Sequence, residues 1–156
     1  MVNCFLTVRS HYDRKLDLAG TCYVRYSFNG EKKVASQSDE IDKVQLSLTT
    51  LATALDDCVE LRPLPTTLQI DTDVNPLIKR YIDKSLNDEE YSNYKDSLDQ
   101  IFLLLANHNW KPVFQKARDH AGMAMVHNAR IAAECETVDF SNLLTDNRIV
   151  LPGRGN

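Results

Sequence analysis

The stretch Tyr26–Val34, YSFNGEKKV, decides the fold because an Asn-Gly pair separates two extended runs. Asn-Gly is the strongest short-range signal for a β-hairpin, since both residues adopt the positive φ angles that the tight turn requires. The run before the pair, Ala19 to Phe28, alternates in polarity, and Glu31 to Gln37 continues beyond it as a further strand. Together with the β-rich run Cys4 to Val8, this pattern predicts an antiparallel meander.

Helices alternate with short strands after the meander. Ser38-Asp39-Glu40 is a helix-start signal, and a helical apolar face follows at Ile41, Val44, Leu48, Leu51, Leu55 and Val59. We expect that helix to end before Pro63. The pattern then predicts a strand at Thr66–Thr72, a helix from Pro76 to about Lys84, a helix containing Leu98–Leu105, a strand at Val113–Ala117 and a helix at Val126–Cys135. The order β-β-β-α-β-α-α-β-α predicts an α/β fold, with a mixed five-stranded sheet flanked by helices.

Composition limits the classes of protein that the chain can belong to. Its 156 residues fit one domain, which we assign to residues 1–138, followed by a C-terminal tail at 139–156. The net charge of −4 argues against a polybasic nucleic-acid binder. The N-terminus lacks the pattern of a signal peptide, and no apolar run is long enough for a bilayer. The 4 cysteines lie far apart, which favours buried reduced thiols. We therefore expect a cytoplasmic protein without a membrane partner.

Several short motifs resemble the type 1 ribonuclease H-like family, and they occur in the family's order over about residues 3–135. Leu6–Ser10 is similar to the family's first strand, apolar-Thr-Asp-Gly-Ser, and Asp42–Leu46 is similar to Asn-Arg-x-Glu-Leu at its first helix. Gln69–Asp73 resembles the fourth strand with its Thr-Asp-Ser signature. Arg118–Gly122 resembles the Lys-Gly-His-Ala/Ser-Gly loop, and Asn128–Ala132 resembles Asn-Glu-x-x-Asp at the last helix. The Asn-Gly hairpin matches the second and third strands.

The resemblance implies an enzyme that cuts the RNA strand of an RNA–DNA hybrid with two Mg²⁺ ions held by four carboxylates. Carried over residue by residue, those carboxylates fall on Val8, Gln45, Asp73 and Ala132. Only Asp73 keeps the acidic group. Valine and alanine offer no ligand atom, and a neutral glutamine replaces a carboxylate poorly. The sequence therefore predicts a degenerate member of the family, with no catalytic residues, no metal site and no cofactor.

A rearranged metal site is the enzymatic alternative. Asp71 and Asp73 are expected to share a strand face, and Asp13, Asp119 and Glu134 are expected to lie nearby. His120 matches the family's mobile histidine, and with Asp71 and Glu134 it completes the candidate set for an unusual nuclease. Mg²⁺ is an expected cofactor only under this alternative.

Without metals, the chain is expected to act as a binding or assembly module with a protein partner. The resemblance suggests an accessory protein of a virus or mobile element. Aromatic side chains dominate interface energetics, so the candidate anchors are Tyr81, Tyr91, Tyr94 and Trp110. The alternative is binding of an RNA–DNA hybrid or duplex without cleavage, for which the candidate phosphate contacts are Lys79, Arg80, Lys116, Arg118 and Arg130.

Overall fold

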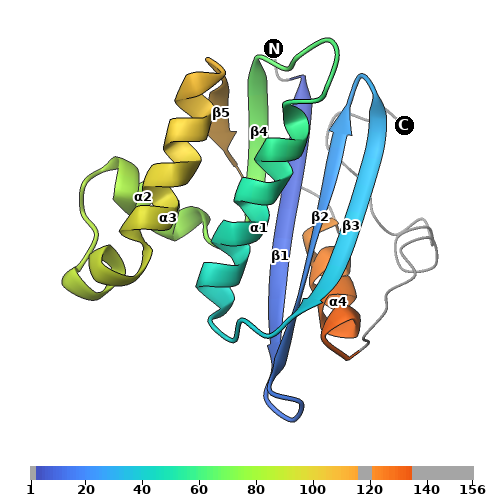
Figure 1. The fold of residues 1–156 in the computed structure, drawn as a ribbon, viewed down its shortest axis with the longest axis vertical. Coiled ribbons are helices and arrows are strands. Elements are labelled where there is room, and N and C mark those ends of the chain that lie inside the picture. The colour runs from blue at the N-terminus through green and yellow to red at the C-terminus, as the bar shows by residue number, and fades with distance from the viewer. Residues whose placement is uncertain (1–2, 116–120, 135–156) are drawn as a thin grey trace.

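The structure, a computed structural model, describes residues 3–115 and 121–134, with only the backbone described at 121–126. They form a five-stranded sheet with helices on both faces (Figure 1). The strands are β1 (Cys4–Asp13), β2 (Leu18–Ser27), β3 (Gly30–Ser38), β4 (Thr67–Thr72) and β5 (Lys111–Phe114). The helices are α1 (Lys43–Cys58), α2 (Asn75–Ile82), α3 (Asp88–Asn107) and α4 (Ala121–Glu134). The predicted element order and the mixed α/β sheet are confirmed.

The strand order is β3-β2-β1-β4-β5. The pairs β1/β2 and β2/β3 are antiparallel, whereas β1/β4 and β4/β5 are parallel. The predicted hairpin forms, but Ser27 pairs with Gly30, so Phe28 and Asn29 are the loop residues. Gly30 has a φ of 97°, whereas Asn29 does not take the positive φ expected of both residues of the pair. Because β1 and β4 are adjacent and parallel, their carboxyl ends lie at the same edge of the sheet, where the candidate site is found.

Helix α1 begins later than the sequence indicates. Its N-cap is Asp42, whose Oδ1 accepts hydrogen bonds from the backbone N–H groups of Val44 at 3.0 Å and Gln45 at 3.3 Å. Ser38 instead ends β3, and Ile41 precedes the helix with 52% of its surface exposed. A carboxylate that accepts two orphan N–H groups is a strong local reason for the helix to start here. Asp42 therefore fixes which α1 side chains face the sheet.

Two layers of helix enclose the sheet. Helices α1 and α3 cover one face, and α4 covers β1 and β2 from the other (Figure 1). The core on the first face joins Leu6 and Val8 of β1 to Leu68 and Ile70 of β4, and to residues of α1 and α3 such as Leu51 and Ile101. On the second face, a Cβ at Gly20 would lie 1.9 Å from the backbone oxygen of Ala129, so glycine permits the close approach of α4.

None of the helices in the described part of the chain has both the length and the apolar character needed to cross a bilayer. The expected boundary between the domain at 1–138 and the tail at 139–156 lies outside the described residues.

Candidate functional site

Asp73 directly follows β4 and lies where β1, β4 and the first turns of α1 meet. Its Oδ1 accepts a hydrogen bond from the Ser47 hydroxyl at 2.7 Å, and its Oδ2 accepts one from the Ser10 backbone N–H at 3.2 Å. The ammonium of Lys43 lies 3.8 Å from Oδ2. We call Ser10, Lys43, Ser47 and Asp73 the Asp73 cluster. Strand β1, helix α1 and the end of β4 each contribute a donor or the acceptor.

Hydroxyl groups continue the cluster into the interior beneath α1. The Ser47 oxygen lies 2.9 Å from that of Ser10, which lies 3.1 Å from that of Thr21. Thr21 and Thr50 then share a 2.7 Å hydrogen bond. All four of these residues are buried. A buried polar network is stabilising when its members find partners, and this chain of hydroxyls meets that condition without a ligand.

The donor set does not fit a pair of magnesium ions. Mg²⁺ binds hard, usually anionic oxygens in near-octahedral geometry and releases its waters reluctantly. Within the described ranges, the oxygens bonded to Asp73 belong to neutral hydroxyls, and the charged side chain that pairs with it is the cation of Lys43. In the described ranges no three His, Cys, Asp or Glu side chains come together in a way that would hold a metal. The cluster is arranged to neutralise one carboxylate.

Two of the sequence-predicted positions have other surroundings. Gln45 points toward α3, where its Nε2 donates to Ser97 at 3.0 Å, and it also donates to Thr49 of α1 at 3.1 Å. Val8 is fully buried in the apolar core beside its β4 partner Thr72. Ser47 and Ser10, each two residues further along, contact Asp73 instead, Ser47 through its hydroxyl and Ser10 through its backbone N–H. The sequence reading missed both residues.

The expected shared face of Asp71 and Asp73 is wrong. Asp71 Oδ1 pairs with Arg9 Nη2 at 2.8 Å, and Arg9 Nη1 also donates to the backbone oxygens of Val8 and Asp71. Successive side chains of β1 point to opposite faces of the sheet, so Arg9 and Ser10 lie on opposite faces. Asp71, which pairs with Arg9, and Asp73, which is bonded to Ser10, are therefore separated by the sheet. Asp71 is 3% exposed and lies on the face opposite the Asp73 cluster.

The two remaining candidates for a rearranged metal site that the structure describes, Asp13 and Glu134, lie in different parts of the molecule. Asp13 closes the β1–β2 hairpin, where its Oδ1 accepts from the backbone N–H groups of Lys15 and Leu16. The end of α4 lies over β3, because the Gln37 side chain donates to the Ala133 carbonyl at 3.0 Å. At this end of α4, Ala132 is buried and Glu134 is exposed. Strands β2 and β1 lie between β3 and β4, and Asp73 follows β4. Asp119 and His120 lie outside the described residues.

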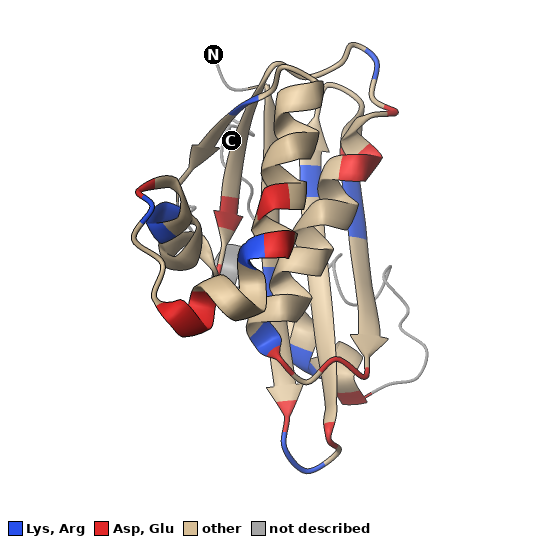
Figure 2. Cartoon of the chain, turned by 60° about the vertical axis from the view of Figure 1, so that its left-hand side comes forward, with Lys and Arg blue, Asp and Glu red and all other residues tan. Residues whose placement is uncertain are grey.

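The predicted basic residues do not form one surface within the described ranges. Two of the three guanidinium nitrogens of Arg80, Nε and Nη2, donate to the Glu90 carboxylate, with Nε 3.1 Å from Oε1. Lys79 is exposed on α2, and Arg130 is exposed on α4, across the sheet. Lys116 and Arg118 lie outside the described residues. Figure 2 shows Lys and Arg interspersed with Asp and Glu rather than gathered into a stripe.

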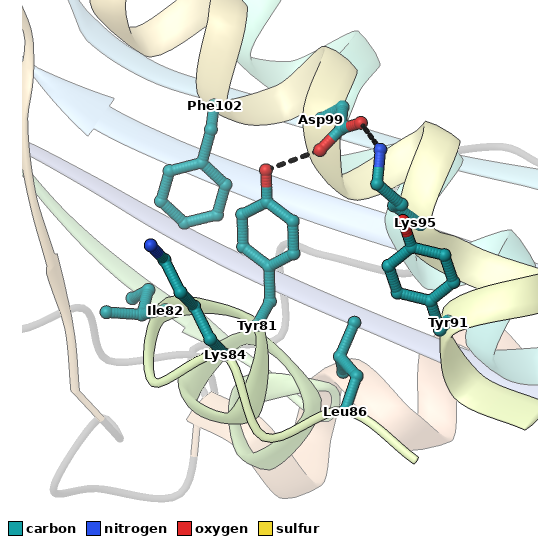
Figure 3. A pocket seen from close by; sticks show the side chains of 8 residues that line it. All are labelled: Tyr81, Ile82, Lys84, Leu86, Tyr91, Lys95, Asp99 and Phe102. Atoms are coloured by element: carbon teal, nitrogen blue, oxygen red, sulfur yellow. Dashed lines mark hydrogen bonds and ion pairs between the residues drawn. The ribbon is translucent and has the colours of Figure 1, made fainter. Parts of the chain in front are cut away.

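The four candidate aromatic anchors have different environments. Trp110 is 4% exposed in the core and stacks on the His108 ring at 4.6 Å. The Tyr94 hydroxyl donates to Asp42 at 2.7 Å; burial and this hydrogen bond raise the pKa of Tyr94 to about 12. Tyr81 and Tyr91 line a pocket of about 660 Å³ between α2 and α3 (Figure 3). This pocket is a second candidate site, separate from the Asp73 cluster.

The sequence matches no protein-family model and no curated protein. The structure is similar to the N-terminal RNase H domain from Mycobacterium tuberculosis, with a TM-score of 0.64 and 12% identity over 86% of this chain and 95% of that one. It is also similar to RNase H1 from Halobacterium salinarum NRC-1, with a TM-score of 0.62 and 13% identity over 84% of this chain and 97% of that one. LC11-RNase H1, solved in complex with an RNA/DNA hybrid, gives a TM-score of 0.66 and 11% identity over 84% of this chain and 96% of that one. The topology of the sheet and these three likenesses lead to one conclusion: the chain has a ribonuclease H-like fold.

Proposed function

We propose that this chain is a ribonuclease H-like binding module that recognises a partner and does not hydrolyse nucleic acid. One observation carries the proposal: both oxygens of Asp73 are engaged by donors from the protein itself. The Ser47 hydroxyl and the Ser10 N–H saturate the inner side of the carboxylate, and Lys43 approaches Oδ2. A metal ion at this point would gain a single carboxylate that already accepts two hydrogen bonds and would lie close to the Lys43 ammonium.

The chemistry of hydrolysis makes that exchange unfavourable. Two-metal hydrolysis needs one ion to activate water and another to stabilise the leaving oxygen, about 4 Å apart. Two dications at that separation repel strongly unless several anionic ligands lie between and around them. The Asp73 cluster has one anionic group and one cationic group. It supports the reading of a scaffold whose catalytic centre has been replaced by a hydrogen-bonded network.

Binding of a hybrid or duplex without cleavage is the second candidate. It is favoured by the likeness to LC11-RNase H1, a protein that was solved with an RNA/DNA hybrid. The pairing of Arg80 with Glu90 and the net charge of −4 weigh against it, because phosphate binding depends on free cations. An accessory role in a virus or mobile element, and a cytoplasmic location, stay predictions from the sequence.

A cleavage assay with matched variants tests the proposal. Wild type, Asp73→Asn and the control Asp99→Asn are incubated with an end-labelled RNA–DNA hybrid in Mg²⁺ or Mn²⁺. We expect all three to match a protein-free blank. Cleavage by wild type and Asp99→Asn that disappears in Asp73→Asn would establish a nuclease and refute the proposal. Binding of the uncut hybrid at about 50 mM salt that weakens steeply at 200 mM would select the second candidate.

A further inference from the structure

The pocket between α2 and α3 is walled mainly by apolar and aromatic side chains. Tyr81 and Phe102 stack with their ring centres 4.9 Å apart, and Phe102 in turn lies 5.9 Å from Phe114 of β5. Ile82 and Tyr91 stand on the rim with 50% and 55% of their surfaces exposed. Figure 3 shows the Tyr81 ring at the centre of the lining, with Phe102 on one side of it and Leu86 and Tyr91 on the other. Exposed apolar groups gathered around a cavity mark a site for a ligand.

The walls of this pocket are fixed by the turn that connects α2 to α3. Lys84 ends α2 in the left-handed conformation, with a φ of 57°, and the Ser85 N–H donates to the Arg80 carbonyl at 2.8 Å. Asn87 and Glu90 form a reciprocal capping box at the start of α3, and Glu90 also binds Arg80. The turn is therefore anchored at both ends. A preformed pocket loses little conformational entropy when a ligand binds.

The charges around the pocket leave one cation available. Asp99 accepts from the Tyr81 hydroxyl and from the Lys95 ammonium, each at 2.6 Å, so both of its oxygens are used. The hydrogen bond from Lys95, and then that from Tyr81, lower the pKa of Asp99. Lys84 also lines the pocket, and its ammonium makes no ion pair with any residue in the described ranges. The pocket thus joins an apolar surface to a free positive charge.

We propose that this pocket docks a segment of a partner protein that presents an aromatic or large aliphatic side chain next to a carboxylate. The apolar side chain covers Ile82 and Tyr91, and the carboxylate pairs with Lys84. A volume of about 660 Å³ accommodates such a pair of side chains. A nucleic acid fits less well, because Lys95 is paired with Asp99 and only Lys84 remains as an unpaired cation among the residues that line the pocket, whereas a phosphate backbone needs several. This inference rests on the proposed function, because it specifies which class of partner the binding module recognises.

Amide NMR shifts report binding at the pocket directly. The probes are the blocked tripeptide acetyl-Asp-Trp-Glu-amide, its counterpart acetyl-Lys-Trp-Lys-amide and a single-stranded DNA hexamer. We expect the acidic peptide to shift the amides of Tyr81, Leu86 and Lys95, with an affinity at least fivefold higher than that of the basic peptide. Lys84→Glu should reverse the preference between the peptides. Ile82→Asp should weaken both at least fivefold.

Leu103→Asp is the matched control, because Leu103 is 60% exposed on α3 outside this pocket. It should leave both affinities unchanged. The inference is overturned by equal affinity for the two peptides, by no shift at these amides at 5 mM peptide, or by tighter binding of the hexamer there. Failure of the proposed function is read separately, from metal-dependent cleavage that Asp73→Asn abolishes. If neither peptide binds and no cleavage is seen, the inference about the pocket is refuted and the proposed function stands.

Discussion

Asp73 and Asp99 have nearly the same partners in two regions that differ in architecture. Asp73 accepts from a serine hydroxyl at 2.7 Å and faces a lysine at 3.8 Å. Asp99 accepts from a tyrosine hydroxyl and a lysine, each at 2.6 Å. The Asp73 side chain is 19% exposed, enclosed by β1, β4 and α1, whereas that of Asp99 is 44% exposed at the wall of an open pocket.

The difference shows that enclosure, rather than the identity of the partners, decides what each carboxylate does. The Asp73 carboxylate accepts hydrogen bonds from its neighbours in the protein, and from Ser47 a network of buried hydroxyl groups extends to Thr50. At Asp99 the ion pair orients Tyr81 and Lys95 beside a cavity whose apolar rim stays uncovered. We infer that the first region stabilises the fold and the second is available for recognition.

The largest effect is expected at the buried pair on the opposite face of the sheet. Arg9→Met removes the cation that is paired with the buried Asp71 carboxylate, which should cost about 3–5 kcal/mol in free energy of unfolding. Urea denaturation measures the loss. The double variant Arg9→Met/Asp71→Leu should recover much of it, because no charge then remains buried. A loss below about 1 kcal/mol in the single variant would show that Asp71 relaxes toward water.

Asp73→Ala should destabilise the protein less, by about 1.5–3 kcal/mol, since it deprives the Ser47 hydroxyl and the Ser10 N–H of a charged acceptor. Asp99→Ala is the matched comparison, and it should lower the melting temperature far less because its partners reach water. Thermal unfolding of both variants by circular dichroism gives the comparison. Equal losses would contradict the assignment of Asp73 as a structural anchor.

Restoring carboxylates should convert the first region into a metal site. In Ser10→Asp/Ser47→Glu, three acidic groups would lie around one point, so the metal-free protein should be less stable than wild type. Mn²⁺ at ten times its dissociation constant should then stabilise the variant by about 1.4 kcal/mol. Wild type, titrated in parallel, should show no change. Stabilisation of both proteins by Mn²⁺ would mean that the natural cluster already binds metal.

The smallest effect concerns pH at the pocket. The hydrogen bonds from Lys95 and Tyr81 hold the pKa of Asp99 below its ordinary value of 3.8. The resulting stabilisation is therefore complete above that value and is lost as pH falls through the lowered folded-state pKa. Carboxyl ¹³C shifts followed against pH measure this titration. A midpoint for Asp99 at or above 3.8 would show that the pair is not formed in solution.

The sequence was sufficient for the arrangement of the fold because its strongest signals are local. Asn29-Gly30 marks a tight turn between two strands, although Gly30 itself begins β3, and the 3–4 spacing of Leu48, Leu51 and Leu55 specifies one helical face. The start of α1 was less readable. Ser38, Asp39 and Asp42 are all good N-cap residues, and only the path of the chain leaving β3 selects Asp42.

The residues around Asp73 could not be located by matching motifs. Ser10 lies on the same face of β1 as Val8, one pleat further on, and Ser47 precedes Leu51 by one turn on the buried face of α1. Those periodicities pointed toward the cluster, but the motif match directed attention to Val8 and Gln45. The placement of Asp71 failed for a related reason: the strand ends at Thr72, so the alternation of faces does not extend to Asp73.

Paramagnetic broadening by Mn²⁺ tests the central claim, that Asp73 is satisfied by its own chain and holds no metal. Amide spectra of the wild-type protein are recorded as Mn²⁺ is raised to 1 mM, with Asp73→Asn as the reference. The account predicts no selective loss of the Ser10, Ser47 and Val74 signals relative to that variant. Selective broadening of these signals at low Mn²⁺, absent in Asp73→Asn, would contradict it.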